Sequence, residues 1–230
     1  MLKFFNIQRW QPALLSLLLG VVCLWGFSTA PVQAASNVPP KYADLPQFSE
    51  VAQVQMRVNG SPITIEVRGE AAPVTAGNFI DLVEKGVYNG VAFHRVVRSP
   101  RPFVVQGGDP QSQDPNIPMS QLGTGGYIDP ETGQRRFIPL EILPEDASVP
   151  VYSRTLRARQ APALKHRRGA VAMARAQSPD SASSQFYFAL SDLPFLDGDY
   201  AVFGYVVGDG MAVVDQIQSG DRIESIEMAY

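Results

Sequence analysis

The sequence is poor in the residues that most often bind metals or form covalent intermediates. Its 230 residues include a single cysteine, Cys23, and only two histidines. A disulfide-rich scaffold and a cysteine-based zinc module are therefore excluded, and almost no ligands remain for a transition metal. Neither a G-x-S-x-G nucleophile elbow nor a P-loop occurs in the sequence. We therefore expect chemistry that needs no cofactor and no metal.

The sequence also has no excess of positive charge. It carries 19 Lys and Arg against 22 Asp and Glu, a formal net charge of −3, so composition gives no reason to expect a nucleic-acid partner. Glycine and proline occur 19 times each, close to ordinary usage, which argues against a low-complexity chain and predicts many turns. The length suits one domain of ordinary size.

The amino terminus has the pattern of an export signal. Lys3 and Arg9 precede a nearly continuous apolar run over residues 13–27, and small residues lead up to Ala34. A basic start, an apolar middle and an A-x-A-like end predict a signal peptide over residues 1–34, so that the mature protein is exported. The alternative is an uncleaved membrane anchor, because the apolar run approaches spanning length. The single cysteine lies in this leader.

The remaining chain is predicted to be one mostly β domain, residues 50–230, after a proline-containing spacer over residues 35–49. Apolar and polar residues alternate on both sides of Asn59-Gly60, which predicts a hairpin over residues 52–68. The period then changes, and a proline in the first turn favours an amphipathic helix over residues 73–86.

Further short strands are expected between turn-forming residues. The predicted strands cover residues 91–97, 103–106, 137–142, 169–174, 186–190 and 201–206, and a second helix is predicted over 211–218. Many short strands with two helices indicate a closed antiparallel barrel with helical caps, or a sandwich. The strands are interrupted at residues 143–168 by a long loop rich in proline and arginine.

Three polar features have an ordinary structural interpretation. Residues 123–126 (GTGG) open no helix after a strand, so a flexible connector is favoured over a phosphate cradle. Asp197-Gly198-Asp199 is typical of a turn rather than of a carboxylate pair. His94 is predicted to be a structural histidine with its hydrogen bonds satisfied. A strand through this region would place Phe93 and Arg95 on one face and His94 on the other.

Six segments, taken in order, resemble the motifs of cyclophilins. They are Phe93-His94-Arg95, Gln106-Gly107-Gly108-Asp109, Gly123-Thr124-Gly125-Gly126, Met173-Ala174, Ser184-Gln185-Phe186, and Leu196-Asp197-Gly198 with Val202-Phe203-Gly204. The resemblance runs from about Ala52 to Ile226. It implies a mainly β fold, a closed eight-stranded antiparallel β-barrel capped by two α-helices, and peptidyl-prolyl cis–trans isomerase activity. With its leader and spacer, the chain resembles the exported members of the family, which are periplasmic or lumenal forms.

The resemblance also implies site residues. Arg95 corresponds to the catalytic arginine, and arginine offers a permanently charged, rigid fork of donors. Gln106 would hold Arg95 or a substrate carbonyl. The apolar slot for proline and the groove beside it would be formed by Phe103, Val104, Gln106, Ala174, Arg175, Ala176, Gln185, Tyr187, Phe195, Leu196 and Tyr200. The expected partners are proline-containing polypeptides.

The sequence departs from the common pattern of the family at several positions. Three extra residues lie within residues 98–102, and Arg175 stands where an asparagine is usual. Tyr187 replaces a phenylalanine of the pocket floor and adds a hydroxyl that needs a partner. Phe195 replaces a tryptophan associated with tight cyclosporin binding, so weak binding of this drug is expected. Tyr200 replaces a histidine.

The insertion at 143–168 is larger than family members usually carry. Between Asp146 and Asp180 the chain has seven basic residues and no acidic one: Arg154, Arg157, Arg159, Lys165, Arg167, Arg168 and Arg175. This pattern suits a loop that docks an anion or a protein partner, or simply a solvated loop. The protein is expected to be a monomer and either an isomerase for exported proteins or a chaperone-like module that binds proline-containing segments.

Overall fold

A computed structural model describes residues 38–157 and 160–229 of the chain. The predicted signal peptide, residues 1–34, lies outside the described residues, as does the start of the predicted spacer. Within the described ranges, no helix has both the length and the apolar character needed to cross a membrane.

The predicted hairpin over residues 52–68 is confirmed. Strand β1 (Val51–Val58) pairs with β2 (Ser61–Arg68) in antiparallel register, with Val58 opposite Ser61. Asn59 and Gly60 connect them with φ values of 50° and 73°, the left-handed conformation that a two-residue hairpin turn requires. The alternating residues Val54, Met56 and Val58 of β1 are fully buried in the core, which fixes the register of the pair.

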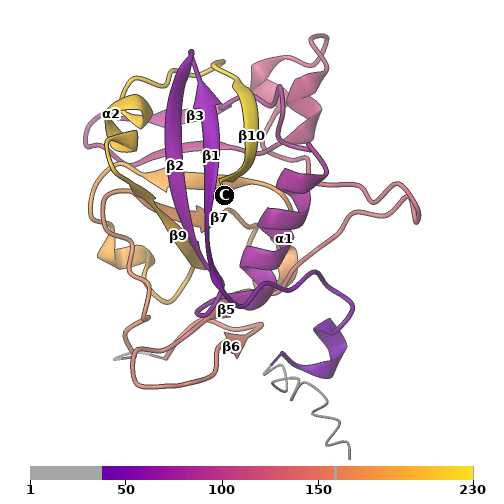
Figure 1. Cartoon of the computed structure of the whole chain (residues 1–230), viewed down its shortest axis with the longest axis vertical. Coiled ribbons are helices and arrows are strands. Elements are labelled where there is room, and N and C mark those ends of the chain that lie inside the picture. Colours follow the sequence, from indigo (N-terminus) through magenta and orange to yellow (C-terminus); the bar gives the residue numbers. More distant parts are fainter. Residues whose placement is uncertain (1–37, 158–159, 230) are drawn as a thin grey trace, which may run out of the picture. The chain divides into compact units, whose positions relative to one another are not determined.

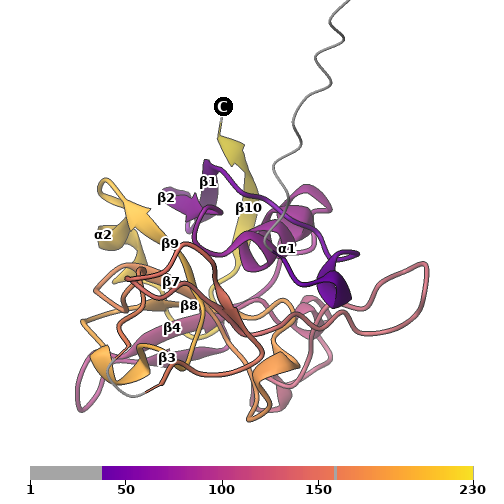
Figure 2. The same cartoon turned by 90° about the horizontal axis from the view of Figure 1, so that it is seen from below.

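Eight antiparallel strands form one curved sheet, in the order β10-β1-β2-β9-β7-β8-β4-β3. Figures 1 and 2 show β1, β2 and β10 on one side of the core, and β3, β4, β7 and β8 on the other. The strands besides β1 and β2 are β3 (Arg95–Val97), β4 (Val104–Gly107), β7 (Ala170–Met173), β8 (Phe186–Ala189), β9 (Val202–Val207) and β10 (Ile223–Ala229).

The two edges of this sheet are joined by the segment that leads into β3. The backbone amide of Gly90 donates to Ile223 at 2.7 Å, and that of Phe93 donates to Asp221 at 2.8 Å. In return, the amide of Gly220 donates to the carbonyl of Phe93 at 2.9 Å. These bonds complete the barrel with a short irregular segment instead of a ninth strand.

In the part of the chain that the structure describes, two α-helices accompany the sheet, as predicted (Figure 1). Helix α1 (Pro73–Glu84) begins with proline, whose missing amide hydrogen is not needed in the first turn. The carboxylate of buried Glu141 accepts hydrogen bonds from the amides of Val74 and Thr75, at 3.1 and 2.8 Å. Helix α2 (Gly210–Val214) ends four residues before the predicted Gln218.

An aromatic cluster fills the centre of the barrel beneath α1. Phe79 of the helix packs edge-on against Phe186 of β8, with ring centroids 5.6 Å apart, and also contacts Tyr88 and Phe203. These four side chains are fully buried. Burial of each such aromatic side chain stabilises the fold by roughly 1.5–3 kcal/mol.

Two strand predictions were wrong in extent and two strands, β6 (Val151–Tyr152) and β10, were missed. Of the predicted strand 137–142, only Glu141–Ile142 (β5) is a regular strand, and it pairs with β6 inside the insertion to form a separate two-stranded sheet. Strand β10 was not predicted, because a register shift opposite Arg57 and Val58 breaks the alternation of its buried residues. Of the predicted strand 91–97, only β3 is regular.

The folded unit begins earlier than the predicted domain boundary at residue 50. Val38, the first described residue, is already buried in the core. A short 3-10 turn, η1 (Pro40–Tyr42), follows, and the side chains of Tyr42 and Phe48 pack against the core. A Cβ atom at Gly69 would lie 2.3 Å from the carbonyl oxygen of Phe48, so the segment is seated closely on the barrel. Its apolar residues explain why it is not a free spacer.

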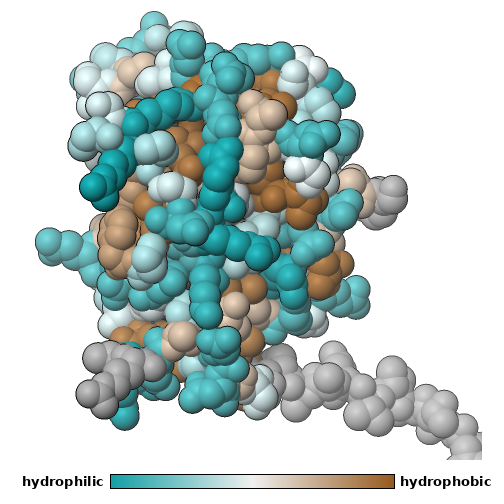
Figure 3. Space-filling model, turned by 90° about the vertical axis from the view of Figure 1, so that its left-hand side faces the viewer, coloured by the Kyte–Doolittle hydropathy of each residue, from teal (hydrophilic) through white to brown (hydrophobic). Residues whose placement is uncertain are grey.

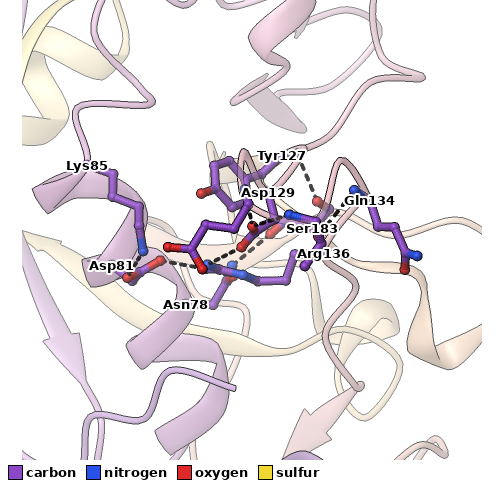
Figure 4. A network of polar contacts seen from close by, with 10 residues as sticks. Asn78, Asp81, Lys85, Tyr127, Asp129, Gln134, Arg136 and Ser183 are labelled. Atoms are coloured by element: carbon purple, nitrogen blue, oxygen red, sulfur yellow. Dashed lines mark hydrogen bonds and ion pairs between the residues drawn. The ribbon is translucent and has the colours of Figure 1, made fainter. Parts of the chain in front are cut away.

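A polar network fastens the loop after residue 123 to helix α1 (Figure 4). Arg136 donates to Asp81 at 2.6 Å and to the Asn78 side chain at 3.3 Å. Asn78 donates to the carbonyl of Ser183 at 2.8 Å, and the Ser183 hydroxyl accepts from the amide of Tyr127 at 3.0 Å. Desolvation opposes ionisation of Asp81, but hydrogen bonds from basic side chains prevail and lower its pKa. This network holds the loop beside the start of β8.

Four further 3-10 turns lie in the loops between the strands. They are η2 (Pro110–Gln113), η3 (Met119–Gln121), η4 (Pro179–Ser181) and η5 (Pro194–Leu196). On the face shown in Figure 3, apolar side chains form small groups separated by hydrophilic ones. Scattered apolar side chains of this kind are ordinary on protein surfaces.

Candidate active site

One row of residues across four strands builds the base of the site. Arg95 of β3 pairs with Gln106 of β4, Gln106 pairs with Tyr187 of β8, and Tyr187 pairs with Ala172 of β7. Directly paired residues point to the same face of a sheet. The sequence therefore brings Arg95, Gln106 and Tyr187 together, although they are far apart along the chain.

A cavity of about 300 Å³ lies over this row. All of the residues that line it are among the predicted site residues: Arg95, Phe103, Val104, Gln106, Ala174, Arg175, Tyr187, Leu196 and Tyr200. Its apolar side chains fit an uncharged ring, and Arg95, Gln106 and Arg175 offer polar groups to an amide beside that ring.

A second cavity, of about 470 Å³, shares Gln106, Ala174 and Arg175 with the first. The predicted residues Ala176 and Gln185 line it as well. It also contains residues that were not predicted as site residues: Gly123, Thr124, Gly125, Arg135, Phe137, Ser181 and Ser183. The two cavities therefore form adjoining parts of one groove.

A chain of side-chain hydrogen bonds runs along the groove. Arg95 Nη1 donates to Gln106 Oε1 at 3.2 Å, and Gln106 Nε2 donates to Gln185 Oε1 at 3.0 Å. Gln185 Nε2 then donates to the carbonyl of Gly125 at 2.8 Å. Both ends of the Gln106 amide are thus occupied, which fixes its orientation and holds the guanidinium of Arg95.

The glycine-rich loop is anchored rather than a free connector. The carboxylate of buried Asp109 accepts hydrogen bonds from the amides of Gly123 and Gly125, at 2.7 and 3.0 Å. Gly123 has a φ of 99°, a conformation that other residues rarely adopt, and a Cβ at Gly125 would lie 2.0 Å from Asp109. The carbonyl of Gly125 therefore faces Gln185, and the amides of Gly123 and Gly125 are not free for a phosphate.

Phenylalanine rings border the pocket on the side of Arg95. The guanidinium carbon of Arg95 lies 5.4 Å from the ring centre of Phe103, and Phe103 stacks on Phe195 with ring centres 6.0 Å apart. Phe195 is 67% exposed and is not part of the lining of either cavity, but it stacks on Phe103 at the rim of the smaller one. Arg95 itself is exposed and lines the 300 Å³ cavity.

Arg175 is fixed along the opposite wall. Its Nε and Nη2 atoms donate to the carbonyl of Asp199 at 2.9 and 2.8 Å, and its guanidinium carbon lies 4.7 Å from the ring centre of Tyr200. The backbone of β7 continues into this segment, and the amide of Ala174 donates to Gln185 at 2.9 Å. These contacts hold the side chain of Arg175 in place in the groove wall.

The hydroxyl of Tyr187 has a buried partner that the sequence alone did not reveal. It lies 3.0 Å from Nε2 of His166, whose Nδ1 lies 2.9 Å from the carboxylate of Asp197. Burial lowers the pKa of His166, and the hydrogen bond with Asp197 opposes this change. Burial also raises the pKa of Tyr187. The sequence held one signal for this contact: a buried tyrosine hydroxyl needs a hydrogen-bond partner, and the chain has only two histidines that could supply one.

The prediction for His94 was wrong. Neither of its ring nitrogens has a hydrogen-bond partner among the described residues. Desolvation lowers its pKa, although Asp109 nearby opposes this. The predicted sharing of a face by Phe93 and Arg95 was also wrong: Phe93 is fully buried in the core while Arg95 is exposed. The regular strand begins only at Arg95, so strict alternation does not extend back to Phe93.

Within the described ranges, no group of three or more His, Cys, Asp or Glu side chains is arranged to hold a metal ion.

Comparison with known proteins agrees with the motifs and the fold. A family model described as cyclophilin type peptidyl-prolyl cis-trans isomerase/CLD matches residues 53–228. A putative thylakoid lumen peptidyl-prolyl cis-trans isomerase of Synechocystis sp. is 39% identical over 204 residues, which are 83% of this chain and 50% of that protein. A probable peptidyl-prolyl cis-trans isomerase of Brucella abortus is 33% identical over 200 residues, covering 86% of this chain and 82% of the relative.

The structural comparison gives the same answer. The crystal structure of a cyclophilin type peptidyl-prolyl cis-trans isomerase of Cryptosporidium parvum aligns with a TM-score of 0.58 at 25% identity, covering 79% of this chain and 99% of that one. The chain spans about half the length of the Synechocystis relative and 45% of a chloroplastic relative from Arabidopsis thaliana. The family model covers most of the chain, and the chain therefore belongs to the cyclophilin-type peptidyl-prolyl cis-trans isomerase family.

Proposed function

We propose that this protein accelerates the cis–trans rotation of X-Pro peptide bonds in polypeptides. The observation that carries the proposal is the position of Arg95, at the edge of an apolar pocket and held by Gln106. A structure related at 26% identity, with a TM-score of 0.56, was solved in the presence of the dipeptide Ala-Pro. We propose that the pocket over β4 and β8 takes the prolyl ring.

The chemistry requires no broken bond. Resonance makes the C–N bond of an amide partly double, so rotation crosses a barrier of roughly 18–20 kcal/mol. The twisted transition state has lost this resonance, and its nitrogen gains a lone pair that can accept a hydrogen bond. A donor fixed near the prolyl nitrogen stabilises the twisted state more than either planar state. Each factor of ten in rate requires about 1.4 kcal/mol of such differential stabilisation.

Arg95 is suited to this role because its charge is permanent and its donors are not used up. Its Nη1 atom donates to Gln106, and the guanidinium lies against the ring of Phe103. Phe103, Val104, Tyr187 and Leu196 supply apolar surface for the ring. Fixing the ring in the pocket and the preceding carbonyl in the groove leaves the X-Pro bond as the axis of rotation.

The adjoining cavity would hold the residues that precede proline. Gln185 and the segment from Ala174 to Ala176 line it, and an extended peptide can pair with their backbone groups. Phe195 offers the drug cyclosporin a smaller ring than the tryptophan usual in the family, so weak binding is proposed.

For the location, we propose an exported protein in the periplasm or the thylakoid lumen, by analogy with the lumenal and chloroplastic relatives. We also propose that the protein works as a monomer on exported polypeptides. Two basic residues of the insertion are paired with acidic side chains, which reduces the positive charge that this loop offers to an anionic partner. Lys165 pairs with Glu145 at 3.3 Å, and Arg168 pairs with Asp215 at 2.6 Å.

A second candidate function is a chaperone-like module that binds proline-containing segments without catalysis. The tyrosine in the pocket floor, Tyr187, is the observation that favours it. The two functions are distinguished by measuring isomerisation of an X-Pro peptide by exchange NMR and binding of the same peptide by calorimetry. Acceleration supports the isomerase, whereas binding without acceleration supports the binding module.

A further inference from the structure

The insertion at 143–168 reaches the pocket through one buried side chain. His166, near its end, is fully enclosed and contacts Tyr187, which lines the pocket for proline. We propose that His166 is a positioning residue: it holds the Tyr187 hydroxyl away from the pocket and keeps the floor apolar. This inference rests on the proposed use of the pocket for proline.

The direction of the hydrogen bonds follows from their partners. An aspartate carboxylate accepts hydrogen bonds and donates none, so His166 must carry its proton on Nδ1, 2.9 Å from Asp197. Nε2 of the neutral ring is then an acceptor. The Tyr187 hydroxyl, 3.0 Å from Nε2, must therefore be the donor.

This arrangement decides what a substrate meets at the pocket floor. The hydroxyl proton of Tyr187 is committed to His166, and the two rings lie nearly parallel, 16° apart. The ring of Tyr187 then presents its carbon atoms to the pocket, much as a phenylalanine would. Without His166, the hydroxyl would need water or a substrate group as its partner, and a prolyl ring offers no hydrogen-bonding group.

The backbone of the insertion is tied to the same wall of the pocket. The amide of His166 donates to Asp197 Oδ1 at 2.7 Å, and its carbonyl accepts from the amide of Leu193 at 2.7 Å. These two bonds bracket η5, which carries the pocket residue Leu196. Earlier in the insertion, the amide of Leu156 donates to the carbonyl of Gly198 at 2.9 Å. The insertion thus supports the wall as well as the floor.

The experiment is a double-mutant cycle of His166→Ala and Tyr187→Phe. For each variant, kcat and KM are measured with an X-Pro peptide, and affinity for the same peptide is measured by calorimetry. His166→Ala is expected to raise KM and Kd about tenfold, with kcat changed less than about twofold, because the pocket binds planar and twisted states alike. In the Tyr187→Phe background, the same substitution is expected to raise KM and Kd by less than about twofold, because no hydroxyl remains.

Two further variants separate positioning from folding. His166→Gln keeps an acceptor near the Tyr187 hydroxyl and is expected to restore most of the affinity. Lys165→Ala changes an exposed residue of the same segment, paired with Glu145, and is the matched control with no expected effect. Thermal unfolding shows which variants are folded. If His166→Ala does not fold, the cycle is read from His166→Gln and its combination with Tyr187→Phe.

A spectroscopic measurement tests the inference independently of activity. The ¹⁵N shifts of His166, one of only two histidines, should show a protonated Nδ1 and an accepting Nε2. A protonated Nε2 at neutral pH overturns the inference. A loss of peptide affinity in His166→Ala that is equally large in the Tyr187→Phe background overturns it as well. If the wild type binds the peptide without isomerising it, the proposed function fails, while the affinity cycle still decides the role of His166.

Discussion

The orientation of Arg95 by Gln106 leads to a quantitative prediction. Gln106→Ala removes the 3.2 Å hydrogen bond to the guanidinium and breaks the link to Gln185. A hydrogen bond to a charged group contributes about 1.5–3 kcal/mol, and the exposure of Arg95 places the expected loss near the lower end. We therefore expect kcat to fall by roughly tenfold, since each 1.4 kcal/mol is a factor of ten in rate.

The loss should lie in kcat rather than in KM. The apolar lining from Phe103, Val104, Tyr187 and Leu196 is untouched by Gln106→Ala, so peptide binding should change less than about threefold. Exchange NMR of an X-Pro peptide gives the rate, and calorimetry gives the affinity. The matched control is Gln216→Ala, an exposed glutamine after α2. A Gln106→Ala variant as fast as the wild type, or one impaired only in binding, would refute this account of how Arg95 is held.

Three further predictions concern stability and drug binding. Arg136→Ala should lower the free energy of unfolding by about 1–3 kcal/mol in urea titrations, because it removes one of the two basic partners of Asp81 and leaves only Lys85. Because the pKa of Asp81 is lowered in the folded protein, this carboxylate stabilises the fold at pH values above its unfolded pKa. The stabilisation is lost as the pH falls through its folded pKa, and in Arg136→Ala this dependence of stability on acid should weaken. Glu141→Ala should cost about 2–4 kcal/mol of stability, because two amides of α1 lose their buried acceptor; a loss below 1 kcal/mol contradicts the capping role. Phe195→Trp should increase cyclosporin affinity in calorimetry, and unchanged affinity would show that the rim residue does not limit it.

Local patterns predicted the elements whose register depends on alternation or on a turn residue. The hairpin at Asn59-Gly60 and the helix that begins at Pro73 are examples. Strand β10 was missed because the register shift opposite Arg57 and Val58 hides its alternation. The start of the folded unit was misplaced because three prolines looked like a spacer, although Val38 is buried in the core.

The site was predictable where family motifs lie on the paired strands and not elsewhere. Arg95, Gln106 and Tyr187 form one row, so naming them from motifs was enough to place them together. His166 could not be assigned, because its contact with Tyr187 depends on how a 26-residue insertion folds, which no local pattern specifies. The unmet hydroxyl of Tyr187 indicated that a partner exists without identifying it.

The most direct test of the central claim is the isomerisation rate of an X-Pro peptide with wild type and Arg95→Ala. The account predicts that the wild type accelerates exchange and that Arg95→Ala lowers kcat by about a hundredfold, the usual scale for removing one transition-state donor, with peptide affinity nearly retained. An Arg95→Ala variant that isomerises the peptide as fast as the wild type would contradict the assignment of Arg95. A wild type that binds the peptide without accelerating exchange would contradict the proposed activity itself.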